Sequence, residues 1–189
     1  MRRISVELKS DSVLGTDLTL EDFFGFSGRV LEWRWKFLGW KAVLAVMNSK
    51  YDNAHYFGPN GIVPNDVWTL RRFAVVERTP IRAGHPYSSA IQLLDAQNWD
   101  CSYLIAFDHT QHVWKIIQFS ELWSEDVKQP QLRMINHGTY ASHAQGAAAL
   151  DLRNRRGTLF SVYGGGFPGI TPQHVAAIFD PNSLEQTHR

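Results

Sequence analysis

The sequence contains one cysteine, Cys101, so an internal disulfide is excluded. It also lacks any run of about 18 apolar residues, which a membrane-spanning helix needs, and any N-terminal segment that resembles a signal peptide. Neither sign of charge dominates, because 19 Lys and Arg face 18 Asp and Glu, and this argues against nucleic-acid binding. We expect a soluble chain; if it is secreted, its leader lies outside this sequence.

The familiar motifs of catalysis and metal binding are missing too. There is no GxSxG elbow, no HExxH and no acidic calcium loop, and the one glycine-rich run lacks the Lys-Ser/Thr of a phosphate loop. His109 and His112 flank a predicted turn, which makes polar turn residues a better interpretation than zinc ligands. We therefore expect no metal, no cofactor and no catalytic residues. An enzyme would need groups such as His137, His143 and Asp151 to meet in a cleft.

Hydrophobic and aromatic residues are abundant, at 44% and 13% of the chain, and they follow a period of two. This alternation predicts strands at 31–37, 40–47, 67–80, 88–94, 101–107 and 113–123, with weaker ones at 132–143, 147–152 and 158–165. Gly39 is predicted to turn the chain between the first two strands. Short helices are predicted at 19–24, with a Thr19–Asp22 capping box, and at 170–181. The fold class is mainly β, an antiparallel meander in one domain, 1–189.

The segment 93–116 places polar residues between apolar strands. Asp95 and Asp108 are predicted to cap hairpin turns with their side chains, and Cys101 to be a buried, inert thiol. Strands in this region are apolar on both faces. Such a sheet must be covered on both sides or must line a cavity.

The segment 48–66 is too long for a hairpin turn and is rich in Asn, Gly, Pro and Asp. It also contains Tyr56 and Phe57. One interpretation is a gate whose aromatic side chains cover a pocket in one state and release it in another. The other is an ordered crossing that shields an edge strand.

Several segments, taken in order, carry a family resemblance. They are 15–23, 35–43 with 48–52, 67–80 leading into 85–99, the meander 93–116, and 167–175. Within the meander, Asp95, Trp99, Asp108 and Trp114 occupy matching places. The chain resembles the bacterial outer-membrane lipoprotein-sorting proteins, relatives of the LolA and LolB lipoprotein carriers, and specifically the C-terminal portion of those longer proteins.

The resemblance implies a curved antiparallel sheet, an incomplete barrel, around an apolar cavity plugged by helices. It implies a periplasmic, non-enzymatic carrier or binding domain for lipid, acyl chains or lipoprotein in the cell envelope. Expected partners are acyl chains and envelope transport proteins. The alternative is a protein-interaction module of an outer-membrane assembly that uses an apolar face or an open sheet edge.

Large apolar side chains on the predicted strands are the candidates for the cavity wall, although the pattern does not decide which face is concave. They are Trp33, Trp35, Trp68, Leu70, Tyr103, Ile105, Phe107 and Trp114.

Overall fold

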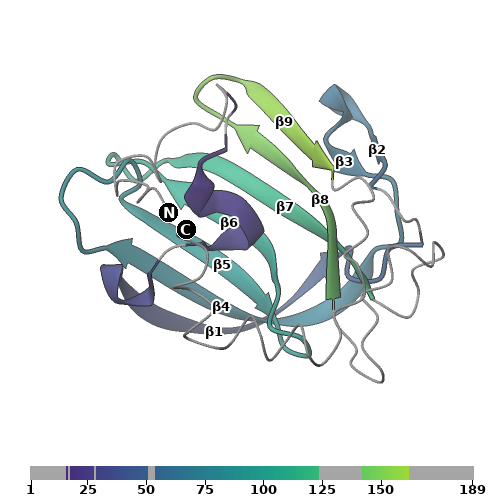
Figure 1. The fold of residues 1–189 in the computed structure, drawn as a ribbon, viewed down its shortest axis with the longest axis horizontal. Coiled ribbons are helices and arrows are strands. Elements are labelled where there is room, and N and C mark those ends of the chain that lie inside the picture. The colour runs from purple at the N-terminus through teal and green to yellow at the C-terminus, as the bar shows by residue number, and fades with distance from the viewer. Residues whose placement is uncertain (1–15, 17, 28, 51–53, 124–141, 162–189) are drawn as a thin grey trace, which may run out of the picture.

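The computed structural model describes residues 16, 18–27, 29–50, 54–123 and 142–161. Its main feature is a seven-stranded antiparallel sheet with the strand order β1-β4-β5-β6-β7-β8-β9, which is not closed into a barrel (Figure 1). The strands are β1 (Trp33–Ala45), β4 (Thr69–Pro80), β5 (Ser89–Asp95), β6 (Cys101–Phe107), β7 (Val113–Trp123), β8 (Ser142–Asp151) and β9 (Arg156–Ser161). The mainly β prediction is confirmed.

Alternation along the strands gives the sheet two distinct faces. In β6, Leu104 and Ala106 are fully buried on one face. Ile105 lies on the other face, where it pairs with Ile91 of β5 and Ile116 of β7. These three isoleucines are only half-buried, so the sheet is apolar on both sides, as the sequence predicted.

The predicted turn at Gly39 is wrong. β1 runs unbroken through this position, and its two halves both pair with β4, with a register shift between Phe37 and Gly39. Gly39 has a φ of 116°, a conformation that suits glycine, and it forms a bulge instead of a hairpin. The long β4 offers partners to the whole of β1, which is why one strand forms instead of two.

Helical structure in the described part is short. η2 (Leu20–Gly25) confirms the predicted capping box, since the Asp22 carboxylate accepts the Thr19 backbone N–H at 2.8 Å. η3 (Val30–Glu32) leads into β1. The segment 48–66 contains β2 (Tyr56–Phe57), η4 (Pro59–Gly61) and β3 (Val63–Pro64). The predicted helix 170–181 and most of the predicted strand 132–143 lie outside the described residues.

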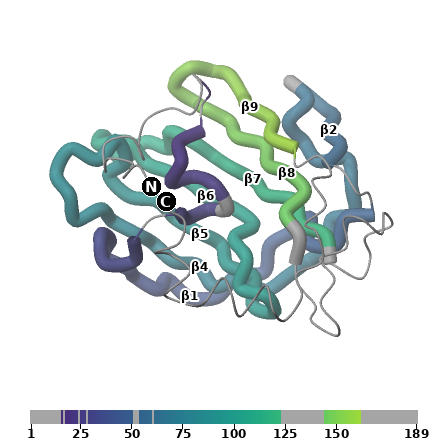
Figure 2. The backbone as a smooth tube through the Cα atoms, in the orientation of Figure 1, coloured from purple at the N-terminus to yellow at the C-terminus, as the bar shows by residue number. Residues whose placement is uncertain are grey.

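η2 lies across β5, β6 and β7 on one side of the sheet, which we call the inner face (Figures 1 and 2). The core between them includes Leu18, Tyr87, Leu104, Ile117 and Phe119. A second cluster lies on the opposite, outer face, where Ala45 and Met47 pack on Phe73 and Leu93. The chain just after β1 therefore covers part of the outer face.

That same segment also joins two strands that are far apart in the sheet order. The Glu121 N–H of β7 donates to the Val46 carbonyl at 3.0 Å, and the Ser49 N–H donates to the Glu121 carbonyl at 2.9 Å. β4, β5 and β6 lie between β1 and β7 in the sheet. We call this pair of hydrogen bonds the β1–β7 clasp.

Candidate functional site

Buried ionisable side chains gather on the inner face beneath η2. We call them the inner cluster. Two acids come from η2, and the other groups come from β4, the turn before β5, and β7. The members are Glu21, Asp22, Arg78, His85, Tyr87 and Lys115, each exposed by 8% or less.

Asp22 is held by donors from two segments, the turn before β5 and strand β7. The Tyr87 hydroxyl donates to its carboxylate at 2.9 and 3.0 Å, and the Lys115 ammonium lies 3.8 Å away. Burial, followed by the negative charge of Asp22, raises the pKa of Tyr87 well above its ordinary value. Tyr87 therefore remains a protonated donor at neutral pH.

Glu21 makes the second contact between η2 and the sheet side. Its carboxylate lies 2.7 Å from Nε2 of His85. The backbone N–H of Tyr87 points at Nδ1 of the same ring, 3.0 Å away. Because Nδ1 accepts this hydrogen bond, the proton of the neutral ring belongs on Nε2, which donates to Glu21.

Arg78 is the exception in the inner cluster. Its side chain is fully buried, and none of its three guanidinium nitrogens has a hydrogen-bond partner among the residues that the structure describes. The guanidinium instead lies over the rings of Trp33, at 4.4 Å, and Phe26, at 5.0 Å. Burial lowers the pKa of Arg78, while the charges of Asp22 and Glu21 oppose that shift.

Beyond the inner cluster, the inner face of β1 and β4 carries exposed apolar side chains. Phe37 contacts Trp40, and Trp40 contacts Trp99, with ring centroids 5.7 and 6.4 Å apart. The Arg72 guanidinium lies 4.3 Å from the centroid of the Trp40 ring. We call this surface the aromatic patch; its members are Trp35 (37% exposed), Phe37 (56%), Trp40 (42%), Leu44 (52%), Leu70 (68%) and Trp99 (60%).

A small apolar pocket lies between η2 and strands β7 to β9. Leu18, Phe23, Phe119 and Phe160 are among its lining residues, and its volume is about 10 Å³. That is roughly the space of one water molecule. This pocket is too small for an acyl chain.

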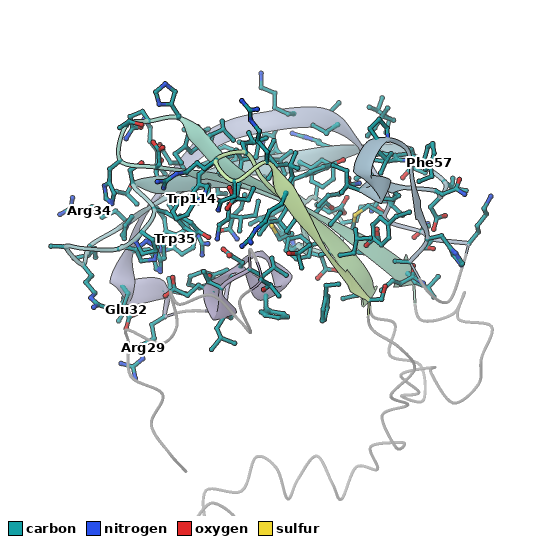
Figure 3. The ribbon with its side chains drawn as sticks, turned by 90° about the horizontal axis from the view of Figure 1, so that it is seen from above. Arg29, Glu32, Arg34, Trp35, Phe57 and Trp114 are labelled. Carbon is teal, nitrogen blue, oxygen red and sulfur yellow. The ribbon has the colours of Figure 1, made fainter. Side chains whose placement is uncertain are left out.

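The predicted wall residues divide between the two faces. On the inner face, Trp33 is buried under Phe26, Trp35 and Leu70 belong to the aromatic patch, and Trp114 contacts Tyr87. Figure 3 shows Trp35 on the side of the sheet that carries η2 and η3.

The remaining predicted wall residues lie elsewhere. Tyr103, Ile105 and Phe107 alternate with the buried residues of β6 and so lie on the outer face, half-buried. Trp68 precedes β4, and its indole N–H donates to the Pro64 carbonyl at 3.1 Å. One contiguous wall made of all eight residues is therefore not formed.

The two predicted gate residues form β2. Tyr56 is half-buried, and burial raises its pKa to about 12. Phe57 is 51% exposed and lies far from Trp35 along the molecule (Figure 3). Their role as a gate stays a prediction.

The turn assignments for the aspartates are confirmed. Asp95 accepts the backbone N–H groups of Gln97 and Asn98, and Asp108 accepts those of Thr110 and His112. In the same region Cys101 is buried, and burial raises its pKa to about 12.

Metal-ligating residue types are dispersed in the part of the chain that the structure describes. Those residues include no group of three or more His, Cys, Asp or Glu placed to hold a metal ion. His137 lies outside them. Among the same residues, no helix is both long and apolar enough to cross a bilayer.

A family model described as a protein of unknown function, DUF1329, matches residues 2–185. The chain belongs to the DUF1329 family. No curated protein matches it. The family assignment agrees with the resemblance inferred from the sequence.

Two solved structures share the fold of this DUF1329 chain. One is described as an outer membrane lipoprotein-sorting protein domain from Vibrio parahaemolyticus; it is 15% identical, with a TM-score of 0.53 over 87% of this chain and 55% of that one. The other is a DUF1329 family protein from Desulfovibrio piger; it is 19% identical, with a TM-score of 0.51 over 93% of this chain and 59% of that one. This chain thus spans less than two thirds of either protein.

The inner cluster was not predicted from the sequence. Its members come from four separate segments of the chain, and no local motif links them. One signal was available, because Arg78 shares its strand face with Ala74 and Val76. A charge on the apolar face of a strand indicates a buried polar site.

Proposed function

We propose that this DUF1329 chain is a binding or carrier domain for acyl chains of lipid or lipoprotein in the periplasm of the bacterial cell envelope. The observation that carries the proposal is the aromatic patch, in which Trp40 contacts both Phe37 and Trp99 while all three remain about half exposed. Large contiguous apolar surfaces on a protein typically mark a binding site. The lipoprotein-sorting description of the Vibrio structure is consistent with this role.

The chemistry of the patch suits an acyl chain. Each methylene transferred from water to an apolar surface contributes about 0.8 kcal/mol, so a chain of a dozen carbons can bind without directed polar contacts. The patch offers rings and leucines with a single stacked guanidinium, that of Arg72. An open patch of this kind holds a chain along its length, whereas the small pocket under η2 cannot hold one.

A second candidate function is a protein-interaction module, because β1 is a 13-residue edge strand that carries part of the patch. An exposed edge with apolar side chains can pair with another chain. The two functions differ in solution. A carrier is a monomer that copurifies with lipid, whereas a module buries the patch in a dimer or a complex.

The proposal is tested with a fluorescent acylglycerol, a probe that carries no charge. We expect the double variant Phe37→Ser/Trp40→Ser to lose at least tenfold in affinity. Each aromatic side chain contributes about 1.5–3 kcal/mol when a ligand covers it, and 1.4 kcal/mol corresponds to tenfold. Titration of probe fluorescence measures the change.

Leu31→Ser is the matched control, since Leu31 is 90% exposed and lies in η3, outside the aromatic patch. Its affinity for the probe should equal that of the wild type. Equal affinities for the wild type and the double variant would refute the carrier proposal. A dimer that dissociates in the double variant would favour the interaction module instead.

A further inference from the structure

Arg78 is in an unusual state for a buried arginine. A guanidinium has five N–H donors, and folded proteins leave very few buried donors without a partner because such burial costs several kcal/mol. In the described part of the chain, all three guanidinium nitrogens of Arg78 lack a hydrogen-bond partner. Its guanidinium carbon lies over the rings of Trp33 and Phe26, and such ring contacts do not satisfy N–H donors.

Three other donors of the inner cluster face η2 from β7 and from the turn before β5. Lys115 supplies an ammonium, Tyr87 a hydroxyl, and His85 the Nε2–H group. All three point at carboxylates of η2. Without η2, these residues would present four donor groups on one surface, two of them on the basic side chains of Arg78 and Lys115.

We propose that Arg78, His85, Tyr87 and Lys115 form a binding site for a phosphomonoester, and that Asp22 and Glu21 of η2 occupy it in this structure. The two carboxylates accept hydrogen bonds from Tyr87 and His85 and form an ion pair with Lys115, but among the described residues the guanidinium of Arg78 has no hydrogen-bond partner. A phosphate group has enough acceptor oxygens to serve Arg78 together with the other donors. None of the four residues belongs to the aromatic patch, although Trp35 of the patch contacts Phe26, which lies over Arg78.

Charge selects the ligand class. η2 brings two negative charges to the site, which match the positive charges of Arg78 and Lys115. A phosphomonoester carries about −1.5 to −2 at pH 7 and would replace them with little change in net charge. A carboxylate or a phosphodiester carries one negative charge and would leave one buried cation unmatched.

The ligand gains access when η2 moves off the sheet. η2 is a six-residue 3-10 helix, a form with poor internal hydrogen-bond geometry. Asp22 and Glu21 supply its charged contacts, and the Gly25 carbonyl accepts a hydrogen bond from the Gln92 side-chain amide at 2.8 Å. Weakening that attachment should open the site. The substitution Asp22→Asn keeps the size of the side chain but removes one of the two negative charges that occupy the site. It should therefore raise the affinity for phosphate.

The test uses two kinds of probe, measured by isothermal titration calorimetry at fixed ionic strength. The first is inorganic phosphate. The second is a matched pair, dioctanoyl phosphatidic acid and dioctanoylglycerol, which share acyl chains and differ by the phosphate group. We expect Asp22→Asn to bind phosphate at least tenfold more tightly than the wild type, and Arg78→Met to lose that binding.

The stability of Arg78→Met and the binding of a control variant show whether a loss of binding is specific to Arg78. Arg78→Met should keep the melting temperature of the wild type, because replacing a buried charge that makes no hydrogen bonds with an apolar side chain is often neutral or stabilising. If it does not fold, Arg78→Lys serves instead; it keeps the charge, loses the planar fork, and should weaken binding several-fold. Arg34→Gln, an exposed arginine on the opposite face of β1, is the control and should bind as the wild type does.

The outcomes separate the sources of the phosphate. Binding of inorganic phosphate that depends on Arg78 indicates a soluble phosphomonoester. A tenfold preference for phosphatidic acid over dioctanoylglycerol that Arg78→Met abolishes, with no response to inorganic phosphate, indicates a lipid headgroup. If the affinity of the protein for both probes is unchanged by Arg78→Met and by Asp22→Asn, the proposal is overturned. Neither result depends on the aromatic patch, so the acyl-chain proposal stands or fails separately.

Discussion

Two aspartates, Asp95 and Asp151, close turns with the same sequence pattern, Asp-x-x-Asn. Asp95 accepts the backbone N–H groups of Gln97 and Asn98, and both carboxylate oxygens are also bound by Arg71 at 2.8 and 2.9 Å. Asp151 accepts the corresponding groups of the turn that follows β8, and the Trp114 indole N–H in addition. Burial alone would raise the pKa of each carboxyl, but these donors outweigh it, and both pKa values lie below the ordinary value.

This lowered pKa gives the Asp95–Arg71 pair a defined pH dependence. A group whose pKa is lower in the folded state contributes stability above its unfolded pKa of about 3.9, and that contribution is lost as the pH falls through the folded pKa. We expect Asp95→Asn to cost about 2–3 kcal/mol at pH 7, because Arg71 is left without its carboxylate. The difference from the wild type should shrink below about pH 4.

Urea unfolding at several pH values between 7 and 3 measures this difference. Asp108→Asn is the comparison, since Asp108 closes an exposed turn and should have a much smaller effect. A difference between Asp95→Asn and the wild type that is the same at every pH would contradict the electrostatic explanation.

The strands of the meander were predictable because each is a short run rich in apolar and β-branched residues, bounded by turn residues. β4 to β7 follow 67–80, 88–94, 101–107 and 113–123 closely, and the capping box at Thr19 was also predicted. β1 was misassigned because a glycine between two β segments indicates a bulge as well as a turn, and only the length of the partner strand decides between them.

The candidate site was less predictable than the strands. Phe37 and Trp40 were expected on strands, yet which face stays open depends on where η2 lies. Arg78 and Asp22 are more than fifty positions apart in the sequence, and only the packing of η2 on β4 to β7 brings them into one cluster. Local patterns give secondary structure, whereas a site of this kind is a property of the tertiary contacts.

η2 fits against the sheet through Gly25, which has a φ of 80°. A Cβ atom at this position would lie 2.4 Å from Sγ and 2.5 Å from Cβ of Cys101. Gly84 has nearly the same φ, 83°, but a Cβ atom there would have open space around it, with no neighbouring atom within 4 Å. The two glycines thus share one backbone conformation and differ only in their surroundings.

We expect Gly84→Ala to cost about 1 kcal/mol, the strain of a left-handed conformation, and Gly25→Ala to cost at least about 2 kcal/mol more through the clash with Cys101. Chemical denaturation of the two variants measures both values. Equal losses would show that the contact between η2 and β6 adjusts freely, contrary to the close fit described above.

At the scale of the whole molecule, the β1–β7 clasp joins strands that the sheet order separates. If the clasp is part of the cooperative core, the amides of Ser49 and Glu121 should exchange with solvent as slowly as the amides in the middle of β5 and β6. The Gly61 amide, which closes the one-turn helix η4, should exchange much faster. Hydrogen exchange followed by NMR compares them, and a Ser49 amide as fast as that of Gly61 would exclude the clasp from the core.

The clasp also constrains the order in which the molecule can assemble. β1 leaves the ribosome before any of its partners, but its pairing with β4 and its hydrogen bonds to β7 both require segments made much later. The hairpins of β4 to β7 close through short turns and can form early, whereas contacts of high sequence separation form slowly. β1 should therefore dock last, and its aromatic face stays open to mispairing until β7 is complete.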